Sequence, residues 1–312
     1  MKKLFVFIFI WLLLAGCTKI LNDDLKKKDP KLVVNATIVP DSAFSVNISR
    51  SFHVLEDESD KNLPFLDKAT VQVFENGDYL FNLDYKTYGN YDKTDYTPET
   101  GKKYTLKVSC PGFKDVTCQA SIPEKVPILD FDTTFTHISD EEYGDYYSYS
   151  GKLKYNDPSG IENQYLLSSK LGYKTETGDT IWGKSWLWPD EAAELLALEL
   201  NGDIFWDDKY TDGKEVTIDF NFYTYSTTYP DNDLPETDTV LIVFYFKTIN
   251  KDYYRYLNSL EKYFYDTYEG TGPFTEPVVI YTNVDKGYGI FAGYALDTTS
   301  VKIVNYAEGG RR

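Results

Sequence analysis

The chain has 312 residues and a formal net charge of −17 at pH 7. Nucleic acid and anionic membrane surfaces are therefore unsuitable partners, because binding to phosphate groups needs a basic protein face. The composition is rich in tyrosine, with 28 Tyr against 1 Met and 2 His, and it favours β-sheet faces and amphipathic surfaces.

Residues 1–16 have the pattern of a secretory signal peptide. Lys2 and Lys3 precede an unbroken apolar run over residues 4–14, and small residues then lead into Cys17. The run is shorter than the roughly 20 residues that a helix needs to cross a bilayer, so a transmembrane helix is the weaker interpretation. Leu-Ala-Gly-Cys resembles the bacterial lipobox, in which the chain is cut before the cysteine and acyl chains are attached to it. This resemblance predicts a lipid anchor at Cys17, with an ordinary secreted signal as the alternative.

Residues 17–30 are too polar to form a core, and they predict a solvated linker between the anchor and a folded body. The acidic residues Asp23 and Asp24 follow shortly after Cys17. Such a cluster resembles the surface-export signal of Bacteroidota lipoproteins. We therefore expect a lipid-anchored protein of the outer membrane that faces the cell surface, with a periplasm-facing body as the alternative.

Residues 31–125 predict a small immunoglobulin-like or transthyretin-like β-sandwich. Short runs of β-branched and aromatic residues alternate with turns that contain Gly, Pro and Asn or Asp. Alternation with period two predicts that one face of each strand is buried. The runs cover residues 32–39, 44–52, 69–77, 79–85, 103–110 and 116–123. Pro123 and Pro127 mark the end of the domain.

Cys110 and Cys118 flank a Pro-Gly turn between the last two of these runs. A hairpin of suitable register would place the two side chains opposite each other, and the compartments beyond the inner membrane permit disulfides. We therefore predict a disulfide between Cys110 and Cys118. A pair of reduced, buried thiols is the alternative, and zinc is not expected because no histidine lies nearby.

Residues 126–312 predict a larger β-rich domain, either sandwich-like or barrel-like, with one α-helix. Strand candidates with partial alternation cover residues 130–135, 146–155, 164–173, 216–225, 240–248, 278–283 and 288–295. The helix is predicted near residues 250–268, because apolar side chains recur at helical spacing from Tyr253 to Phe264 and Asn250 is a suitable N-cap.

Trp182, Trp186 and Trp188 lie close together among Gly, Lys and Pro. In an extended segment the three indoles would share one face. Such a face is either part of a core, which we favour because large apolar residues are usually buried, or a platform that binds a ligand. These three residues are therefore the weak candidates for ligand binding.

Catalytic and metal-ligating patterns are not evident in the sequence. His53 and His137 have no metal-ligand spacing and no recognisable nucleophile as neighbour, so we expect no catalytic residues, no metal and no cofactor. The densest acids are Asp207 and Asp208 and a run that begins at Asp231, and we interpret them as solvated loops. A pair of carboxylates for hydrolysis could still be assembled from the 49 acids.

Segments in order along the chain resemble the Bacteroidota lipoprotein family known as domain of unknown function 4249 (DUF4249). In the first half these are LVVNATIVPDSAFSVNISRSF, FLDKATVQVFENG, PETGKKYTLKVSCPGF and VTCQASIPEKVPI. In the second half they are YNDPSGIENQYLL, DIFWDDKYTDGKEVTIDF, YYRYLNSLEKYF and PFTEPVVIYTNVDKGYGIFAGYA. The resemblance covers nearly all of the chain after Cys17.

The resemblance implies an accessory lipoprotein of a TonB-dependent uptake system. The implied partners are a SusC-like transporter and its SusD-like lipoprotein, with a glycan or peptide as ligand. We therefore expect a non-catalytic accessory or ligand-binding subunit. A carboxylate-based hydrolase of the same system and a structural spacer at the cell surface are the alternatives.

Overall fold

The structure is a computed structural model, and it describes residues 29–52, 64–140, 144–174, 178–223, 239–268 and 278–304. The predicted signal peptide, Cys17, most of the linker, His53 and the acidic run at Asp231 lie outside these ranges. Within them, no helix combines the length and the apolar character that a membrane span requires.

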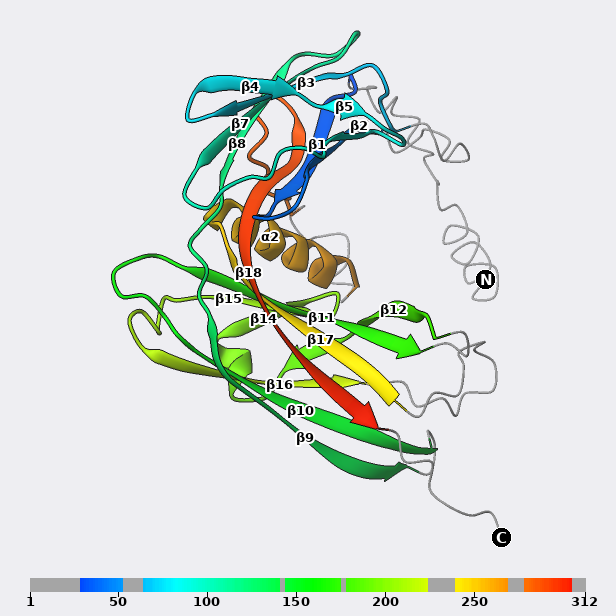
Figure 1. The fold of residues 1–312 in the computed structure, drawn as a ribbon, viewed down its shortest axis with the longest axis vertical. Coiled ribbons are helices and arrows are strands. Elements are labelled where there is room, and N and C mark those ends of the chain that lie inside the picture. The colour runs from blue at the N-terminus through cyan, green and yellow to red at the C-terminus, as the bar shows by residue number, and fades with distance from the viewer. Residues whose placement is uncertain are drawn as a thin grey trace, which may run out of the picture.

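The described chain is mainly β, as predicted, and its strands form one ten-stranded and two four-stranded sheets. The ten-stranded sheet runs through the whole molecule, and each four-stranded sheet covers one end of it (Figure 1). The result is two β-sandwiches that share a sheet. Of the sandwich-like and barrel-like forms that the sequence allowed for the C-terminal part, the structure thus has the sandwich-like form.

The N-terminal sandwich forms from the short strands predicted between residues 32 and 123 and from one further strand, β6, that was not predicted. On the ten-stranded sheet these are β1 (Leu32–Ile38), β2 (Phe44–Arg50), β5 (Asp84–Tyr85) and β6 (Asn90–Lys93). The facing sheet has the order β4-β3-β7-β8, with β3 (Thr70–Glu75), β4 (Asp78–Asn82), β7 (Lys103–Ser109) and β8 (Val116–Ser121). Alternate side chains of β1 and β7 are buried, because one face of each strand meets the opposite sheet.

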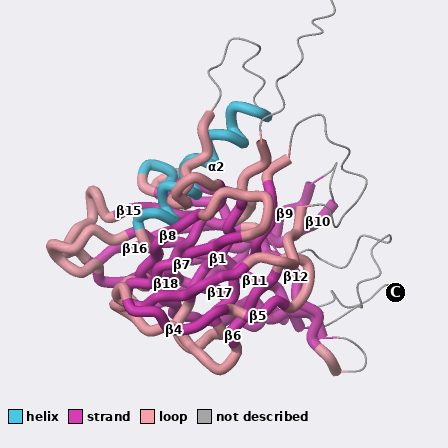
Figure 2. Tube along the Cα trace, turned by 90° about the horizontal axis from the view of Figure 1, so that it is seen from above, coloured by secondary structure: helices cyan, strands magenta, loops and turns pink. Residues whose placement is uncertain are grey.

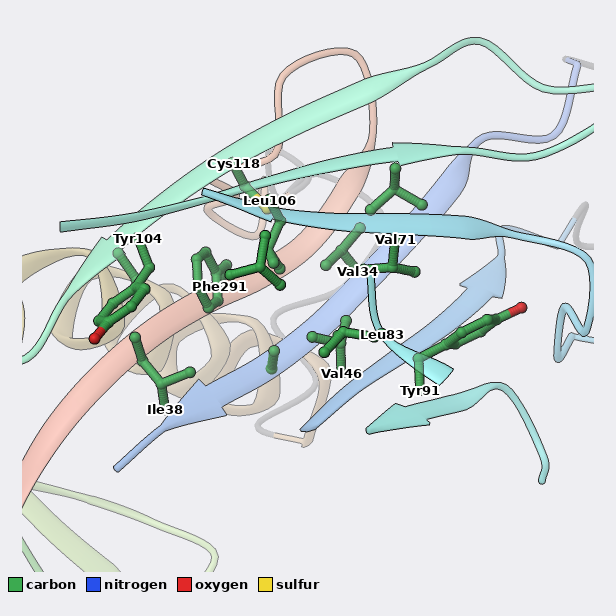
Figure 3. Close-up of a cluster of buried hydrophobic side chains, with 14 of the residues drawn as sticks. Val34, Ile38, Val46, Val71, Leu83, Tyr91, Tyr104, Leu106, Cys118 and Phe291 are labelled. Atoms are coloured by element: carbon green, nitrogen blue, oxygen red, sulfur yellow. The ribbon is translucent and has the colours of Figure 1, made fainter. Parts of the chain in front are cut away.

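The core of this sandwich is largely aliphatic, and Val34, Val71 and Leu106 meet at its centre (Figure 3). It also contains Phe291 and Val284, which lie far away in the sequence. The N-terminal sandwich is therefore completed by a segment from the end of the chain.

The C-terminal sandwich uses the other half of the ten-stranded sheet. This half includes β11 (Gln164–Lys174), β12 (Thr180–Ser185), β14 (Ala197–Leu200), β15 (Asp203–Asp207) and β17 (Thr239–Ile249). They face β9 (Ile128–Asp140), β10 (Gly144–Asn156), β13 (Leu187–Pro189) and β16 (Glu215–Tyr223). A 3₁₀ turn (Ala193–Leu195) connects β13 to β14. The core between these sheets is aromatic, with Trp206, Phe220, Phe244 and Phe246 buried.

Strand β18 (Tyr288–Val304) belongs to both sandwiches (Figure 1). Its first part pairs in parallel with β1, and from Tyr294 onward it pairs antiparallel with β17. At the change of partner, a Cβ on Gly293 would lie 2.4 Å from the carbonyl oxygen of Ser121. Only glycine lets the backbones approach this closely.

Helix α2 (Lys251–Tyr268) confirms the helix predicted near residues 250–268. The side-chain oxygen of Asn250 accepts a hydrogen bond of 3.0 Å from the backbone N–H of Tyr253, which is the predicted N-cap. Leu257 packs with Leu166 and Phe205 in a small third core. The helix therefore covers part of the outer face of the ten-stranded sheet (Figure 2).

The strand predicted over residues 278–283 is wrong, because these residues pair with no strand in the described part of the chain. The Asn283 side chain instead exchanges hydrogen bonds with the backbone of Phe291, at 2.7 and 3.0 Å. A side-chain amide thus takes the place of a backbone ladder beside β18.

The predicted disulfide is also wrong, since Cys110 and Cys118 are free and buried. The β7–β8 register places Cys118 opposite Leu106, four residues before Cys110. At ~3.3 Å per residue this offset is about 13 Å, whereas bridged cysteines have Cα atoms within about 7 Å. Cys118 lies in the core of the N-terminal sandwich (Figure 3), and burial raises the pKa of its thiol.

Candidate ligand-binding site

The candidate site lies on the outer face of the ten-stranded sheet, beside helix α2. Along β17, Phe244 and Phe246 point into the aromatic core, so Tyr245 and Lys247 point outward. Strand β11 does the same, because Leu167 belongs to the core while Ser168 and Lys170 alternate with the core positions. Polar and charged side chains therefore alternate with core residues along both strands and lie together on the outer face of the sheet.

A cavity of about 510 Å³ opens where β11 changes its partner. Strand β11 pairs with β15 through Leu167 and with β12 from Ser169 onward. The described residues that line the cavity are Ser168, Ser169, Lys170, Trp182, Gly183, Lys184, Asp203, Tyr245, Lys247, Tyr294 and Leu296. This volume lies in the range of roughly 300–1,000 Å³ that small-molecule sites occupy.

The described lining has three lysines and a single acid, so it is cationic on a strongly anionic protein. Lys170 and Lys184 are directly opposite each other in the β11–β12 register. Like charges opposite each other on neighbouring strands destabilise a sheet. The arrangement therefore has an electrostatic cost that an anion in the cavity would offset.

Lys247 lies at the bottom of this cluster and is partly buried. Its Nζ donates a hydrogen bond of 2.9 Å to Oγ of Ser168 and lies 5.3 Å from the ring centre of Tyr294. Burial lowers the pKa of Lys247 to about 8; Asp203 opposes this shift, and the other two lysines of the cavity add to it.

Asp203 is the counter-charge, and its Oδ1 lies 3.3 Å from Nζ of Lys184. This oxygen is buried, and its contact with Lys184 is an ion pair. Burial raises the pKa of Asp203, while Lys184 and Lys247 act in the opposite direction. Among the described lining residues, one carboxylate therefore balances only part of the positive charge of three ammonium groups.

Two of the three candidate tryptophans are exposed, which corrects our preference for a core position. Trp182 is 46% exposed and Trp186 is 47% exposed. Trp182 is opposite Gly172 and its ring covers that residue, since a Cβ there would lie 3.0 Å from the indole. An aromatic ring over a cross-strand glycine is a known sheet arrangement. The ring of Trp186 lies 5.8 Å from Nζ of Lys184.

Trp188 lies in β13 and pairs with Asn221 of β16, so it belongs to a different sheet from Trp182. The predicted common face of three indoles is therefore wrong. The chain leaves one sheet after Ser185 and joins the other at Leu187. Trp182 lines the cavity. Trp186 instead packs on Gly202, where a Cβ would lie 2.8 Å from its ring.

A second charged cluster lies at the other end of β11 and contains Asp157, Asp208 and Asp212. One oxygen of each carboxylate lies within 4.8 Å of the others, and carboxylate oxygens are ligands that Ca²⁺ prefers. Burial raises the pKa of Asp208, and the hydrogen bond from the backbone of Asn163 opposes this shift. The charge of Asp157 adds to it, so the pKa is raised overall. These residues are the described acids that could hold a cation.

Hydrogen bonds from the protein nevertheless reach each of these carboxylates. Asp157 accepts from the Tyr165 hydroxyl and, at 3.0 Å, from the backbone N–H of Gly213. Asp208 accepts at 2.6 Å from the N–H of Asn163. Asp212 accepts at 2.7 Å from the N–H of Gly160. The cluster thus ties the loop after β10 to the loop after β15. Asp208 is buried, which corrects our interpretation of it as part of a solvated loop.

Sequence reasoning missed the lysine cavity, although it singled out Trp182 at its rim. The available signal was weak. Ser168, Lys170 and Lys247 are polar residues at the outward positions of two strands whose inward positions are mostly apolar. His137 lies in β9, and its side chain is outside the described part of the structure.

Comparison with known proteins identifies a family. The family model described as "Domain of unknown function (DUF4249)" matches residues 18–300. No curated protein matches the chain. Among solved structures, a variant of BcpA, the major pilin subunit of Bacillus cereus, is 12% identical with a TM-score of 0.20. The match covers 71% of this chain and 65% of the pilin subunit, and at this TM-score it carries no argument.

Proposed function

The chain belongs to the DUF4249 family, and we propose that it is a non-catalytic, lipid-anchored protein of the outer-membrane surface. Its role is to bind a ligand for a TonB-dependent uptake system, as an accessory subunit of a SusC-like transporter or of its SusD-like partner. The anchor is Cys17, as the lipobox-like sequence predicts.

The single observation that carries the binding role is the cavity of about 510 Å³ with Trp182 at its rim. Half-exposed indoles are costly on a surface that has no partner, and exposed aromatic side chains are frequent anchors of binding sites. A spacer needs no such cavity. A binding protein does.

A hydrolase that uses carboxylates is the second candidate, because Asp157, Asp208 and Asp212 converge. Two of the three are buried, and their oxygens accept hydrogen bonds from the loops that they connect. A glycosidase needs one carboxyl group that protonates the leaving group and another that attacks or activates water. The hydrogen bonds favour a structural role over this one.

The test is isolation of the tagged, lipidated protein from its own membranes in mild detergent. We expect stoichiometric recovery of an outer-membrane transporter, identified by mass spectrometry. Recovery of the protein alone would contradict the accessory role. Cys17→Ala tests the anchor separately, and its presence in the outer-membrane fraction would show that lipidation at this residue is not the attachment.

A further inference from the structure

We infer that the cavity between β11, β12 and β17 binds an oligosaccharide that carries carboxylate groups, such as a chain of uronic acids. The inference rests on the proposed ligand-binding role and names the chemical class of the ligand. The cavity offers three ammonium groups in its lining and the half-exposed indole of Trp182 at its rim.

The charge argument starts from the contrast between the cavity and the whole protein. A body with a net charge of −17 repels anions in general. Even so, Lys170, Lys184 and Lys247 converge on one cavity with Asp203 as the acid among the described lining residues. The direct opposition of Lys170 and Lys184 adds a cost, which the ion pair between Lys184 and Asp203 offsets in part and an anion between the two lysines would offset further. A carboxylate supplies that negative charge.

The partial burial of Lys247 supports the same conclusion. Its ammonium group lies against the ring of Tyr294 and the hydroxyl of Ser168, where an apolar residue of similar length would be more stable. Positions that sacrifice stability in this way are concentrated at functional sites. A positive charge at the bottom of a cavity orients an anionic group that enters it.

The aromatic rings select a sugar over other anions. Trp182 lines the cavity, and the ring of Trp186 lies 5.8 Å from Nζ of Lys184. Each indole presents about half of its surface to solvent. The face of an indole carries partial negative charge and attracts the C–H groups along one side of a pyranose ring. A uronic acid whose pyranose ring stacks on the indole has its carboxylate within reach of the ammonium groups.

An acidic peptide is the competing ligand, and the position of the cavity disfavours it. Peptides that bind to sheets do so mainly by adding a strand to an edge, so that backbone hydrogen bonds give the affinity. Here the ligand would lie on the outer face of β11 and β17, both of which are paired on each side. Side chains, and not backbone groups, are available there.

The experiment is calorimetric titration of the full-length lipidated protein in detergent with oligomers of galacturonate, guluronate and glucuronate. The controls are the same oligomers after reduction of their carboxyl groups and an oligoglutamate peptide. We expect at least one uronate oligomer to bind at least about tenfold more tightly than its reduced form. We also expect its affinity to fall several-fold as NaCl rises from about 50 to 500 mM.

Matched variants locate the binding. Lys170→Gln combined with Lys184→Gln should weaken binding by roughly tenfold or more. Lys152→Gln combined with Lys154→Gln removes the same charge from β10 in the other sheet and should leave affinity unchanged. Trp182→Ala should weaken binding by a similar factor, while Tyr210→Ala, which also removes an exposed aromatic ring, should not. Circular dichroism verifies that each variant is folded.

Several results would overturn the inference: no binding by any uronate, equal binding by the reduced oligomers, preference for oligoglutamate, or equal losses in the two lysine pairs. Recovery of the transporter does not depend on any of these. A transporter complex without uronate binding would therefore leave the proposed function standing and remove only the ligand class. Uronate binding without recovery of a transporter would leave the ligand class standing and contradict the accessory role in uptake.

Discussion

The two ends of strand β11 carry opposite charge clusters, and they differ in how those charges are satisfied. Near its beginning, Asp157 and Asp208 accept hydrogen bonds from backbone groups of the loops that they connect. Near its end, Lys170, Lys184 and Lys247 surround a cavity of about 510 Å³ with Asp203 as their counter-charge. Charges used by the protein itself build the fold, whereas charges that face a cavity are available to a ligand.

Asp157→Ala should give the largest effect, because it leaves the hydroxyl of Tyr165 and the N–H of Gly213 without their acceptor. We expect the free energy of unfolding to fall by about 3 kcal/mol, as measured by urea denaturation. Glu194→Gln, at an exposed acid, is the control and should change it by less than about 0.5 kcal/mol. A loss as small as the control's would mean that the aspartate cluster is not structural.

Lys247→Met should have the opposite sign, because it removes an ammonium group that burial disfavours. The pKa of Lys247 is lowered to about 8 in the folded state, against 10.5 in a solvated lysine. At pH 7 we expect a gain in the free energy of unfolding of about 2 kcal/mol. Destabilisation at pH 7 would show that the lysine belongs to the structural class of charges.

The pH dependence of the same pair of proteins sharpens this test. Between about pH 8 and pH 10.5 the unfolded chain keeps the Lys247 proton and the folded chain has lost it. Stability therefore rises with pH in this window for the wild type, relative to Lys247→Met. Denaturation curves at pH 7.5 and pH 10.5 should show the difference between the two proteins shrinking.

Trp182→Ala should change stability only slightly, by less than about 1 kcal/mol, since nearly half of the side chain is already exposed. The variant loses the packing of the indole on Gly172. Thermal unfolding of the variant measures this. A loss of several kcal/mol would place Trp182 among the core residues and weaken its assignment to the binding site.

Calcium should have the smallest effect. If hydrogen bonds already satisfy the aspartate cluster, 1 mM Ca²⁺ against EDTA should shift Tm by less than about 1 °C. A rise of several degrees, lost in Asp208→Asn, would instead assign Asp157, Asp208 and Asp212 to a cation site.

Local patterns in the sequence predicted the local parts of the fold. Helix α2 and its Asn250 cap follow from helical spacing and a preferred capping residue, both of which act within one turn. The register of β7 and β8 does not follow from composition, and that register separates Cys110 from Cys118. Strand register depends on packing against the opposite sheet.

The candidate site was harder to predict for the same reason. Lys170 and Lys184 become neighbours only when β12 pairs with β11, and Lys247 joins them only through β17. The spacing of Trp182, Trp186 and Trp188 suggested one face, but the chain passes from one sheet to another between the second and third. Sequence reasoning found the rim residue and not the charges.

The dual membership of β18 has a consequence for how the protein is made. The parallel pairing of Val33 with Tyr288 closes the N-terminal sheet, and Phe291 fills its core. Synthesis proceeds from the N-terminus, so this sandwich lacks a strand and the core residues Val284 and Phe291 until nearly the whole chain has been produced. Contacts between such distant segments slow folding and leave apolar surface exposed meanwhile. Biogenesis of this protein should therefore depend strongly on chaperones that hold the unfinished N-terminal half in solution.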